Sequence, residues 1–98
     1  MKHHNIKQFK DFFQPIVDCR MRSIIRYDDR SYAVGDTVTL HEGWHEDGEY
    51  IYTGRTISGR IAFIDNFGCQ PGYVCMSLED VGLLIADDLP GMLQEQAY

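Results

Sequence analysis

The sequence predicts an α+β domain in which an N-terminal helix packs against a mostly antiparallel β-sheet or barrel. The first observation is size: 98 residues, of which 44% are hydrophobic, provide one core and are too few for two. The second is a run of apolar residues at helical spacing near the N-terminus. The third is a series of short β-branched runs after residue 22, separated by turn residues. We therefore expect one domain over residues 1–98, with its core at about 6–78.

The helix is expected over residues 8–18, where apolar side chains follow the i, i+3, i+4, i+7, i+8 spacing of an amphipathic helix. These side chains are Phe9, Phe12, Phe13, Ile16 and Val17. Pro15 removes one amide donor and crowds the preceding turn, so the helix should kink there or divide into two short turns. An aromatic stripe at this spacing is more typical of a core than of a ligand site, and we expect it to be buried.

Four later segments are predicted to be strands, because they are short, rich in β-branched and aromatic residues, and bounded by turn signals. They are residues 23–27, 36–42, 56–64 and 72–78. Residues 43–54 are acidic, flanked by glycine and rich in aromatics, which fits an irregular loop or a loose hairpin. The C-terminal extension, residues 79–98, has no basic residue and only weak helical spacing around Leu83 and Leu84. We expect a short helical turn and a frayed end there.

The charges are distributed unevenly along the chain. The net charge is -6, which argues against indiscriminate binding to nucleic acid. Residues 1–30, however, hold seven of the nine lysines and arginines against four aspartates, and the remainder holds two arginines against eleven acids. This asymmetry predicts a basic face on an acidic body, which can bind a phosphate locally. Solvated surface whose charges happen to segregate is the alternative.

The cysteines and the hydropathy pattern indicate the compartment. Three cysteines, Cys19, Cys69 and Cys75, form no zinc or redox spacing. The N-terminus does not resemble a signal peptide, and the longest nearly apolar run, residues 81–86, is far below the roughly 20 residues of a membrane span. These features predict free thiols, a cytoplasmic location and no membrane partner.

Several separated motifs, in order, resemble the ASCH domain of the PUA-like superfamily. They are "IIRYDDRSYAVGDTVTLHE", "YTGRTISGRIAFI" and "QPGYVCMSL", after a helix and a basic connection. Within that superfamily the chain looks most like small ASCH-like proteins of phages and prophages, whose recurring segments include Arg-x-x-Asp-Arg, Val-Gly-Asp, Tyr-Thr-Gly-Arg and Pro-Gly-Tyr-Val. The resemblance covers residues 6–78. It implies a small β-barrel with a cleft between the barrel and the first helix, in a superfamily whose clefts bind RNA or modified nucleosides.

Candidate binding residues follow from this resemblance together with the charges. The resemblance carries over Lys7, Arg26, Asp29, Arg30, Gly35 and Asp36. The expected nucleic-acid-binding residues are Lys7, Arg20, Arg22, Arg26, Tyr27, Arg30 and Trp44. The arginines offer planar forks for a phosphate or a base edge, and the two aromatic residues offer stacking faces. Asp28 and Asp29 are expected to orient the arginines. The alternative is a structural ion pair of Asp29 with Arg30, while Gly35 and Asp36 fit a turn that sets the next strand.

The chain also departs from the ASCH pattern. Some ASCH members remove the acetyl group from acetylated cytidine, with chemistry resembling a Lys/Thr/Glu set. Aligned on Arg26, the lysine and threonine positions here are Met21 and Ile24, and neither side chain can activate a nucleophile or transfer a proton. We therefore do not expect this activity, and we expect no catalytic residue.

The remaining motifs give weak signals. His41 and His45 are four residues apart with acids nearby, but His41 lies in a strand pattern and no third or fourth ligand follows at zinc spacing. We expect no metal and no cofactor. Three functions remain: a non-catalytic module that binds RNA or a nucleotide-like ligand, a phage-type factor whose acidic surface engages a basic host protein, and a hydrolase of a modified nucleoside with different catalytic residues.

Overall fold

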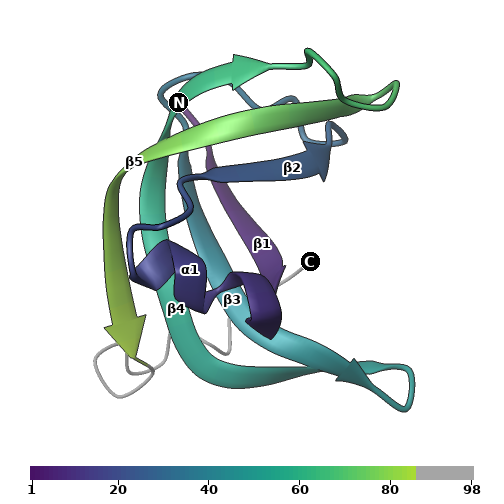
Figure 1. The fold of residues 1–98 in the computed structure, drawn as a ribbon, viewed down its shortest axis with the longest axis vertical. Helices are drawn as coiled ribbons and strands as arrows, with labels where there is room; N and C mark the ends of the chain where they lie inside the picture. Colours follow the sequence, from purple (N-terminus) through teal and green to yellow (C-terminus); the bar gives the residue numbers. More distant parts are fainter. Residues whose placement is uncertain (86–98) are drawn as a thin grey trace.

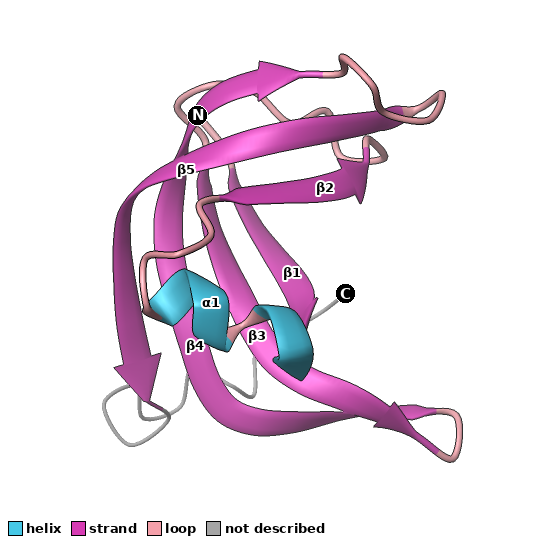
Figure 2. Cartoon of the chain, viewed as in Figure 1, coloured by secondary structure: helices cyan, strands magenta, loops and turns pink. Residues whose placement is uncertain are grey.

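The computed structural model describes residues 1–85, which form one curved, mixed β-sheet with two short helical turns (Figures 1 and 2). The strands are β1 (His3–Phe9), β2 (Ser23–Tyr27), β3 (Thr37–Glu46), β4 (Glu49–Asp65) and β5 (Tyr73–Ile85). The turns are a 3-10 helix, η1 (Lys10–Phe12), and an α-helix, α1 (Gln14–Val17). The strand order is β1-β3-β4-β5-β2. β1 pairs with β3 in parallel, and all the other neighbours are antiparallel.

The sheet bends because its two longest strands change register. The β4–β5 ladder shifts between Ser58 and Arg60 and again between Ile61 and Phe63. Each such irregularity bends a strand and increases its twist. Figure 1 shows the result: the upper part of β5 crosses the molecule beside β2, and its lower part runs alongside β4. β1 and β2 therefore lie at the two ends of the strand order but belong to one curved sheet.

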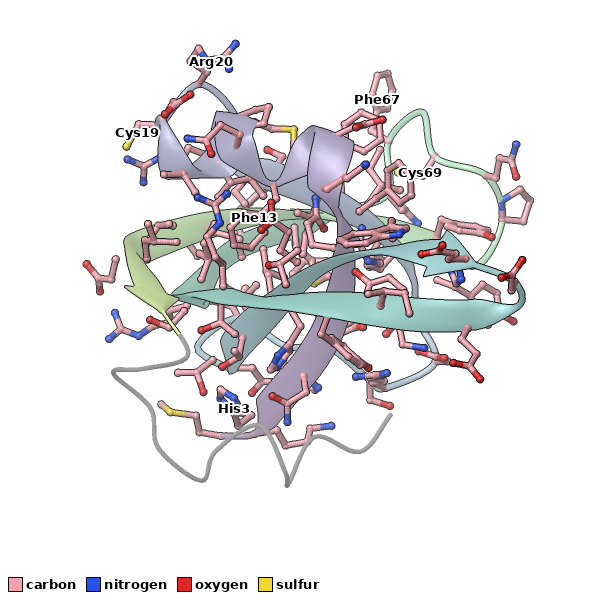
Figure 3. All side chains as sticks on the ribbon, turned by 90° about the horizontal axis from the view of Figure 1, so that it is seen from below. His3, Phe13, Cys19, Arg20, Phe67 and Cys69 are labelled. Atoms are coloured by element: carbon pink, nitrogen blue, oxygen red, sulfur yellow. The ribbon has the colours of Figure 1, made fainter. Side chains whose placement is uncertain are left out.

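The core fills the concave side of this sheet. Its largest fully buried side chains include Phe13, Ile16, Leu40, Ile57, Ile61 and Met76. Phe13 and Ile16 come from the helical segment, and Figure 3 shows Phe13 pointing between that segment and the strands. The expected helical stripe is thus only partly buried, because Phe9 lies in β1 and is 39% exposed, and Phe12 is 56% exposed. The segment breaks into two short turns, and Pro15 lies in the first turn of α1.

The predicted architecture, a barrel with an N-terminal helix packed against it, is wrong. The described chain begins with a strand, and β1 and β2 are not paired with each other, so the sheet is open. The hydrophobic pattern did not predict β1, because two of the three buried side chains of this strand, those of His4 and Gln8, are polar, and only Ile6 is apolar. The pairing of β1 could not be inferred from local sequence, since its parallel partner β3 is far away in the chain.

The C-terminal expectations divide at residue 85. Residues 79–85 continue β5, so the helical spacing around Leu83 and Leu84 predicted the wrong structure. The rest of the expected extension, residues 86–98, lies outside the described residues. Among the helices of residues 1–85, none has the length and apolar character needed to span a membrane.

Candidate functional site

Two arginine side chains bridge the open ends of the sheet. Arg26 on β2 donates hydrogen bonds to the backbone carbonyl of Lys7 at 2.9 Å and to the side-chain oxygen of Gln8. Arg30 donates to the backbone carbonyl of Asn5. Asn5 and Lys7 are alternate residues of β1, so their carbonyls point to the same side, away from β3. We call Arg26 and Arg30 the arginine clasp, because their guanidinium groups satisfy an edge that no strand covers.

Arg26 differs from most other arginines in its surroundings. Arg20, Arg30, Arg55 and Arg60 each have a carboxylate within 4.0 Å. Arg26 is half-buried, and its partners within the described residues are neutral oxygens, including the carbonyl of Ile25 at 2.8 Å. Burial lowers the pKa of Arg26, because no carboxylate offsets the loss of water around its charge.

A groove of about 550 Å³ opens beside the clasp, between the end of β1, β2 and the β3–β4 hairpin. Its lining residues are Lys7, Gln8, Phe9, Phe12, Met21, Ser23, Ile24, Ile25, Arg26, His45 and Tyr50. They include two permanent cations and three aromatic rings apart from histidine, and no carboxylate. In a chain with a net charge of -6, this composition makes the groove locally positive and apolar.

Tyr50 holds the hairpin side of the groove. Its hydroxyl hydrogen is shared between two carbonyl oxygens, those of Gln8 at 3.0 Å and His41 at 2.9 Å, and the ammonium group of Lys7 lies 5.1 Å from its ring centre. Burial, followed by the neighbouring Tyr52, raises the pKa of Tyr50 to about 12. The ring fits because residue 43 is glycine: a Cβ atom there would lie 2.5 Å from the Tyr50 ring. Gly43 therefore marks a close approach that only glycine allows.

A smaller hollow of about 300 Å³ lies on the other side of Arg26. It is lined by Ile6, Lys7, Arg26, Tyr27, Asp29, Arg30 and Tyr32. Asp29 lies 3.8 Å from Arg30, so the expected pair exists, but the two side chains are 59% and 35% exposed. Within residues 1–85, Asp28 forms no ion pair with an arginine, and its carboxylate accepts a hydrogen bond from the backbone amide of Tyr32 at 3.1 Å. The main contact of Arg30 is the β1 edge.

The structure gathers some of the predicted binding residues and scatters others. Lys7, Arg26, Tyr27 and Arg30 meet around the groove and the hollow. Arg20 points outward from the loop after α1 (Figure 3) and pairs with Asp18 at 3.3 Å. Arg22 is exposed and lines neither opening.

Trp44 is also outside the groove. It alternates with His45 along β3, so the two side chains point to opposite faces of the hairpin. Trp44 donates to Glu46 at 3.2 Å and lies under the ammonium group of Lys10, 5.2 Å from its ring centre. We expected Trp44 to offer a stacking face, whereas the structure puts Phe9, Phe12 and Tyr50 in the groove.

The missed groove residues carried a signal that pointed elsewhere. Phe9 and Phe12 fit a helical stripe, but the structure places Phe9 in β1 and Phe12 in η1, before α1 begins, and exposes both. His45 and Tyr50 belong to a hairpin whose two-residue turn, Asp47-Gly48, has positive φ angles of 51° and 83°. Aspartate followed by glycine between alternating strands is a strong hairpin signal, and it could have placed His45 opposite Tyr50.

The positions considered for catalysis and for a metal are Met21, Ile24, His41 and His45. Met21 and Ile24 line the groove with apolar side chains, and Ile24 is 3% exposed. His41 is buried in β3, where its ring nitrogen lies 3.1 Å from the side-chain oxygen of Asn5, and burial lowers its pKa to about 4. His45 instead packs edge-on against Tyr50. Within residues 1–85, no three histidine, cysteine or carboxylate side chains gather as a metal centre would require.

Gly35 and Asp36 form the turn that was expected, and Asp36 also anchors the N-terminus. Gly35 has a φ of 96°, which favours glycine. The buried Asp36 carboxylate accepts from the backbone amides of Lys2 at 2.9 Å and Ala33 at 3.1 Å, and lies 2.8 Å from the His4 ring nitrogen. The His4 hydrogen bond, with the backbone bonds, lowers the pKa of Asp36 to about 2.

A family model described as a domain of unknown function, DUF3850, matches residues 3–78. The chain belongs to the DUF3850 family. The matched residues run from the start of β1 into β5, so they include the clasp, the groove and all five strands at least in part.

The DUF3850 domain is also similar to a phage protein. The "Uncharacterized 12.9 kDa protein in GpA 3′ region" of Escherichia phage P2 is 35% identical over 60 residues. This match covers 61% of the chain and 51% of the phage protein, so the chain spans about half the length of that relative. The similarity supports a phage-associated family of small proteins. It does not confirm the ASCH or PUA-like resemblance.

Proposed function

We propose that this DUF3850 domain binds RNA or a nucleotide-like ligand in the groove beside the arginine clasp, without catalysis. The observation that carries the proposal is Arg26, a half-buried guanidinium whose partners within residues 1–85 are all neutral. A phosphate beside such a group gains more than one beside an exposed arginine, because the surroundings screen the attraction less. Three N–H groups of Arg26 make the observed bonds, and a guanidinium has five, so two remain for a ligand.

The rest of the groove suits the base and sugar of such a ligand. Phe9 and Phe12 are exposed rings at its rim, and stacked bases gain about 1 to 3 kcal/mol each on aromatic side chains. Lys7 supplies a second cation next to Arg26. The negative charge of the remaining surface would repel phosphates elsewhere, which favours local binding over coating of the protein. The ASCH-like pattern around Arg26 is consistent with this proposal.

Non-catalytic binding is favoured over hydrolysis of a modified nucleoside. The groove positions that correspond to the catalytic lysine and threonine of the ASCH pattern hold Met21 and Ile24, whose side chains neither donate nor accept a proton. We also propose a cytoplasmic location, on the basis of the three unbridged cysteines. A protein partner is a separate proposal, which concerns the exposed side of β2, β5 and the end of β4.

The test is a titration of labelled single-stranded RNA, followed by fluorescence anisotropy at several salt concentrations. Phe12→Ala should weaken binding by about 1 to 3 kcal/mol, because it removes a stacking face. Phe63→Ala is the matched control, since Phe63 is 59% exposed, against 56% for Phe12, but lies outside the groove. Arg26→Ala should also weaken RNA binding. Arg60→Ala is the matched control for that loss of a cation, because Arg60 lies outside the groove and pairs with Glu79 and Asp80. Equal effects of Phe12→Ala and Phe63→Ala would refute the proposal, as would the absence of RNA binding.

A further inference from the structure

The convex side of the sheet exposes a group of apolar side chains where β2, β5 and the end of β4 lie side by side (Figure 1). Cross-strand pairing places Tyr27 opposite Tyr73 and Ile25 opposite Cys75, while Phe63 lies opposite Ser77. Partners in a ladder share a face, so all these side chains point the same way. Their inward-facing neighbours are buried: Ile24 and Met76 are 3% and 0% exposed. We call Ile25, Tyr27, Phe63, Tyr73 and Cys75 the outer face.

The outer face is well exposed and held in place. Ile25 and Tyr27 are each 56% exposed, Phe63 is 59% and Tyr73 is 37%. The Tyr27 ring packs edge-on against Tyr73 with 5.4 Å between ring centres. It also lies against Gly72, where a Cβ atom would come within 2.8 Å of the ring. The two tyrosines therefore present their remaining surface in a fixed arrangement, which lowers the entropy lost on binding.

Charge indicates what can cover this face. The other residues that share this patch are Ser23, Asp65 and Ser77, and the next pair on the same side is Arg60 with Glu79, in which Arg60 is neutralised by Glu79 and Asp80. Asp28 and Asp29 follow Tyr27 directly, and both are exposed; Arg30 lies 3.8 Å from Asp29 in a partly exposed pair that a second cation can share. A nucleic acid or an anionic membrane would bring phosphates against these carboxylates, and a second copy of this chain, with its net charge of -6, would add further negative charge; both arrangements are repulsive. A cationic partner meets opposite charge instead.

The size of the face limits the kind of partner. Three strands at about 4.8 Å spacing are roughly 10 Å across, and the five residues of β2 extend about 13 Å. This area matches a short segment rather than a large, flat interface. Arginine suits it better than lysine, because a guanidinium stacks on tyrosine and phenylalanine rings and also forms two parallel hydrogen bonds with a carboxylate.

We propose that the outer face docks an arginine-containing basic segment of a partner protein. The rings of Tyr27, Tyr73 and Phe63 stack on its guanidinium groups and apolar side chains, while Asp29 and Asp65 pair with its charges. This face adjoins the groove proposed for nucleic acid, because Ile25 lines that groove and Tyr27 lines the hollow, but Phe63 and Tyr73 line neither opening. The two proposals can therefore succeed or fail separately.

The probe is a fluorescent synthetic peptide of alternating arginine and leucine, titrated into the intact protein and followed by anisotropy. Two matched peptides replace arginine with lysine or with glutamate. The arginine peptide should bind most tightly, the lysine peptide more weakly, and the glutamate peptide should not bind. Phe63→Ser and Tyr73→Ser should each weaken binding of the arginine peptide by about tenfold, the loss expected for one stacked cation.

The matched control is Phe12→Ser, which removes an equally exposed ring from the groove and should leave the arginine peptide unaffected. Asp29→Lys provides a second variant at an exposed position, which tests the charge argument if Tyr73→Ser unfolds; it should also weaken binding. Several results would overturn the proposal: no binding of the arginine peptide, equal binding of the glutamate peptide, or unchanged affinity in Phe63→Ser. A concentration-dependent dimer that Phe63→Ser dissociates would assign the face to a second copy instead.

Discussion

Replacing Arg26 with alanine should lower the free energy of unfolding by about 2 kcal/mol, although Arg26 has no ion pair among the described residues. The side chain makes two hydrogen bonds across the open edges, to Lys7 and Gln8, and one to the adjacent carbonyl of Ile25. A hydrogen bond from a charged donor contributes about 1.5 to 3 kcal/mol. The groove admits water, which would solvate the released oxygens, so the loss should lie near the value for one such bond.

Urea unfolding of the variant measures this loss. With an m-value of about 1 to 3 kcal/mol/M, a loss of 2 kcal/mol lowers the midpoint by roughly 1 M. Arg26→Lys should recover only part of the stability, because an ammonium group has no planar fork to reach both oxygens. Arg20→Ala is the control: its pair with Asp18 is exposed at both ends and should change the midpoint little.

The salt dependence separates a clasp from an ion pair. The partners of Arg26 are neutral, so its contribution should change little when the salt concentration rises. An ion pair between Arg30 and Asp29 would weaken under the same conditions, because both side chains are partly exposed and salt screens their attraction. A loss below about 0.5 kcal/mol for Arg26→Ala would show that the clasp does not hold the edges, and a strong salt dependence would contradict the neutral-partner argument.

Three further predictions concern the core, the groove and acid stability. Phe13→Ala should cost about 3 to 5 kcal/mol in urea unfolding, because Phe13 is 0% exposed; a loss below about 1 kcal/mol would contradict its place in the core. Gly43→Ala should also destabilise the fold and lower the melting temperature, because the new Cβ would overlap the carbonyl oxygen of Ile51 and lie 2.5 Å from the Tyr50 ring; an unchanged melting temperature would exclude the close approach. In the folded protein the pKa of His41 is lowered to about 4 and that of Asp36 to about 2. Each group therefore contributes its full stability above the pKa that it has in the unfolded chain. That contribution is lost as the pH falls from the unfolded pKa through the folded pKa. Thermal melts should therefore show stability falling from about pH 6.5 downward, and Asp36→Asn should remove the step nearest pH 2 while leaving the one that begins near pH 6.5.

The four strands predicted after residue 22 are confirmed, because each carries enough local information to be recognised. "SIIRY" is β2 without an error at either end, and the runs around Val38, Ile57 and Val74 lie in β3, β4 and β5. They are rich in β-branched and aromatic residues, and glycine, proline, aspartate and asparagine separate them. The segment expected to be a loop or a loose hairpin, residues 43–54, joins β3 and β4 as a hairpin.

The N-terminal third could not be predicted in the same way. Phe9, Phe12 and Phe13 are at helical spacing and favoured one helix. In the structure Phe9 is the last residue of β1, and of the three side chains only that of Phe13 is buried. β1 is specified by long-range contacts: its parallel pairing with β3, the buried bond of His4 to Asp36, and the clasp. Hydrophobic periodicity contains no record of such polar contacts, and the candidate site depends on them.

The same polar contacts bear on both roles considered for the charged segment at the end of β2, residues 26–30. The sequence offered two alternatives for Arg26 and Arg30, a ligand-binding edge or a structural pair with an aspartate. The clasp makes both alternatives incomplete, since the arginines bind the β1 backbone and Arg26 still has unused donors. A phosphate that accepts hydrogen bonds from those donors would neutralise the charge of Arg26. It would not displace the bonds of Arg26 to Lys7 and Gln8. Ligand binding and closure of the edges should therefore reinforce each other, and Arg26→Ala must weaken both; Phe12→Ala, which touches only the ligand, separates the two effects.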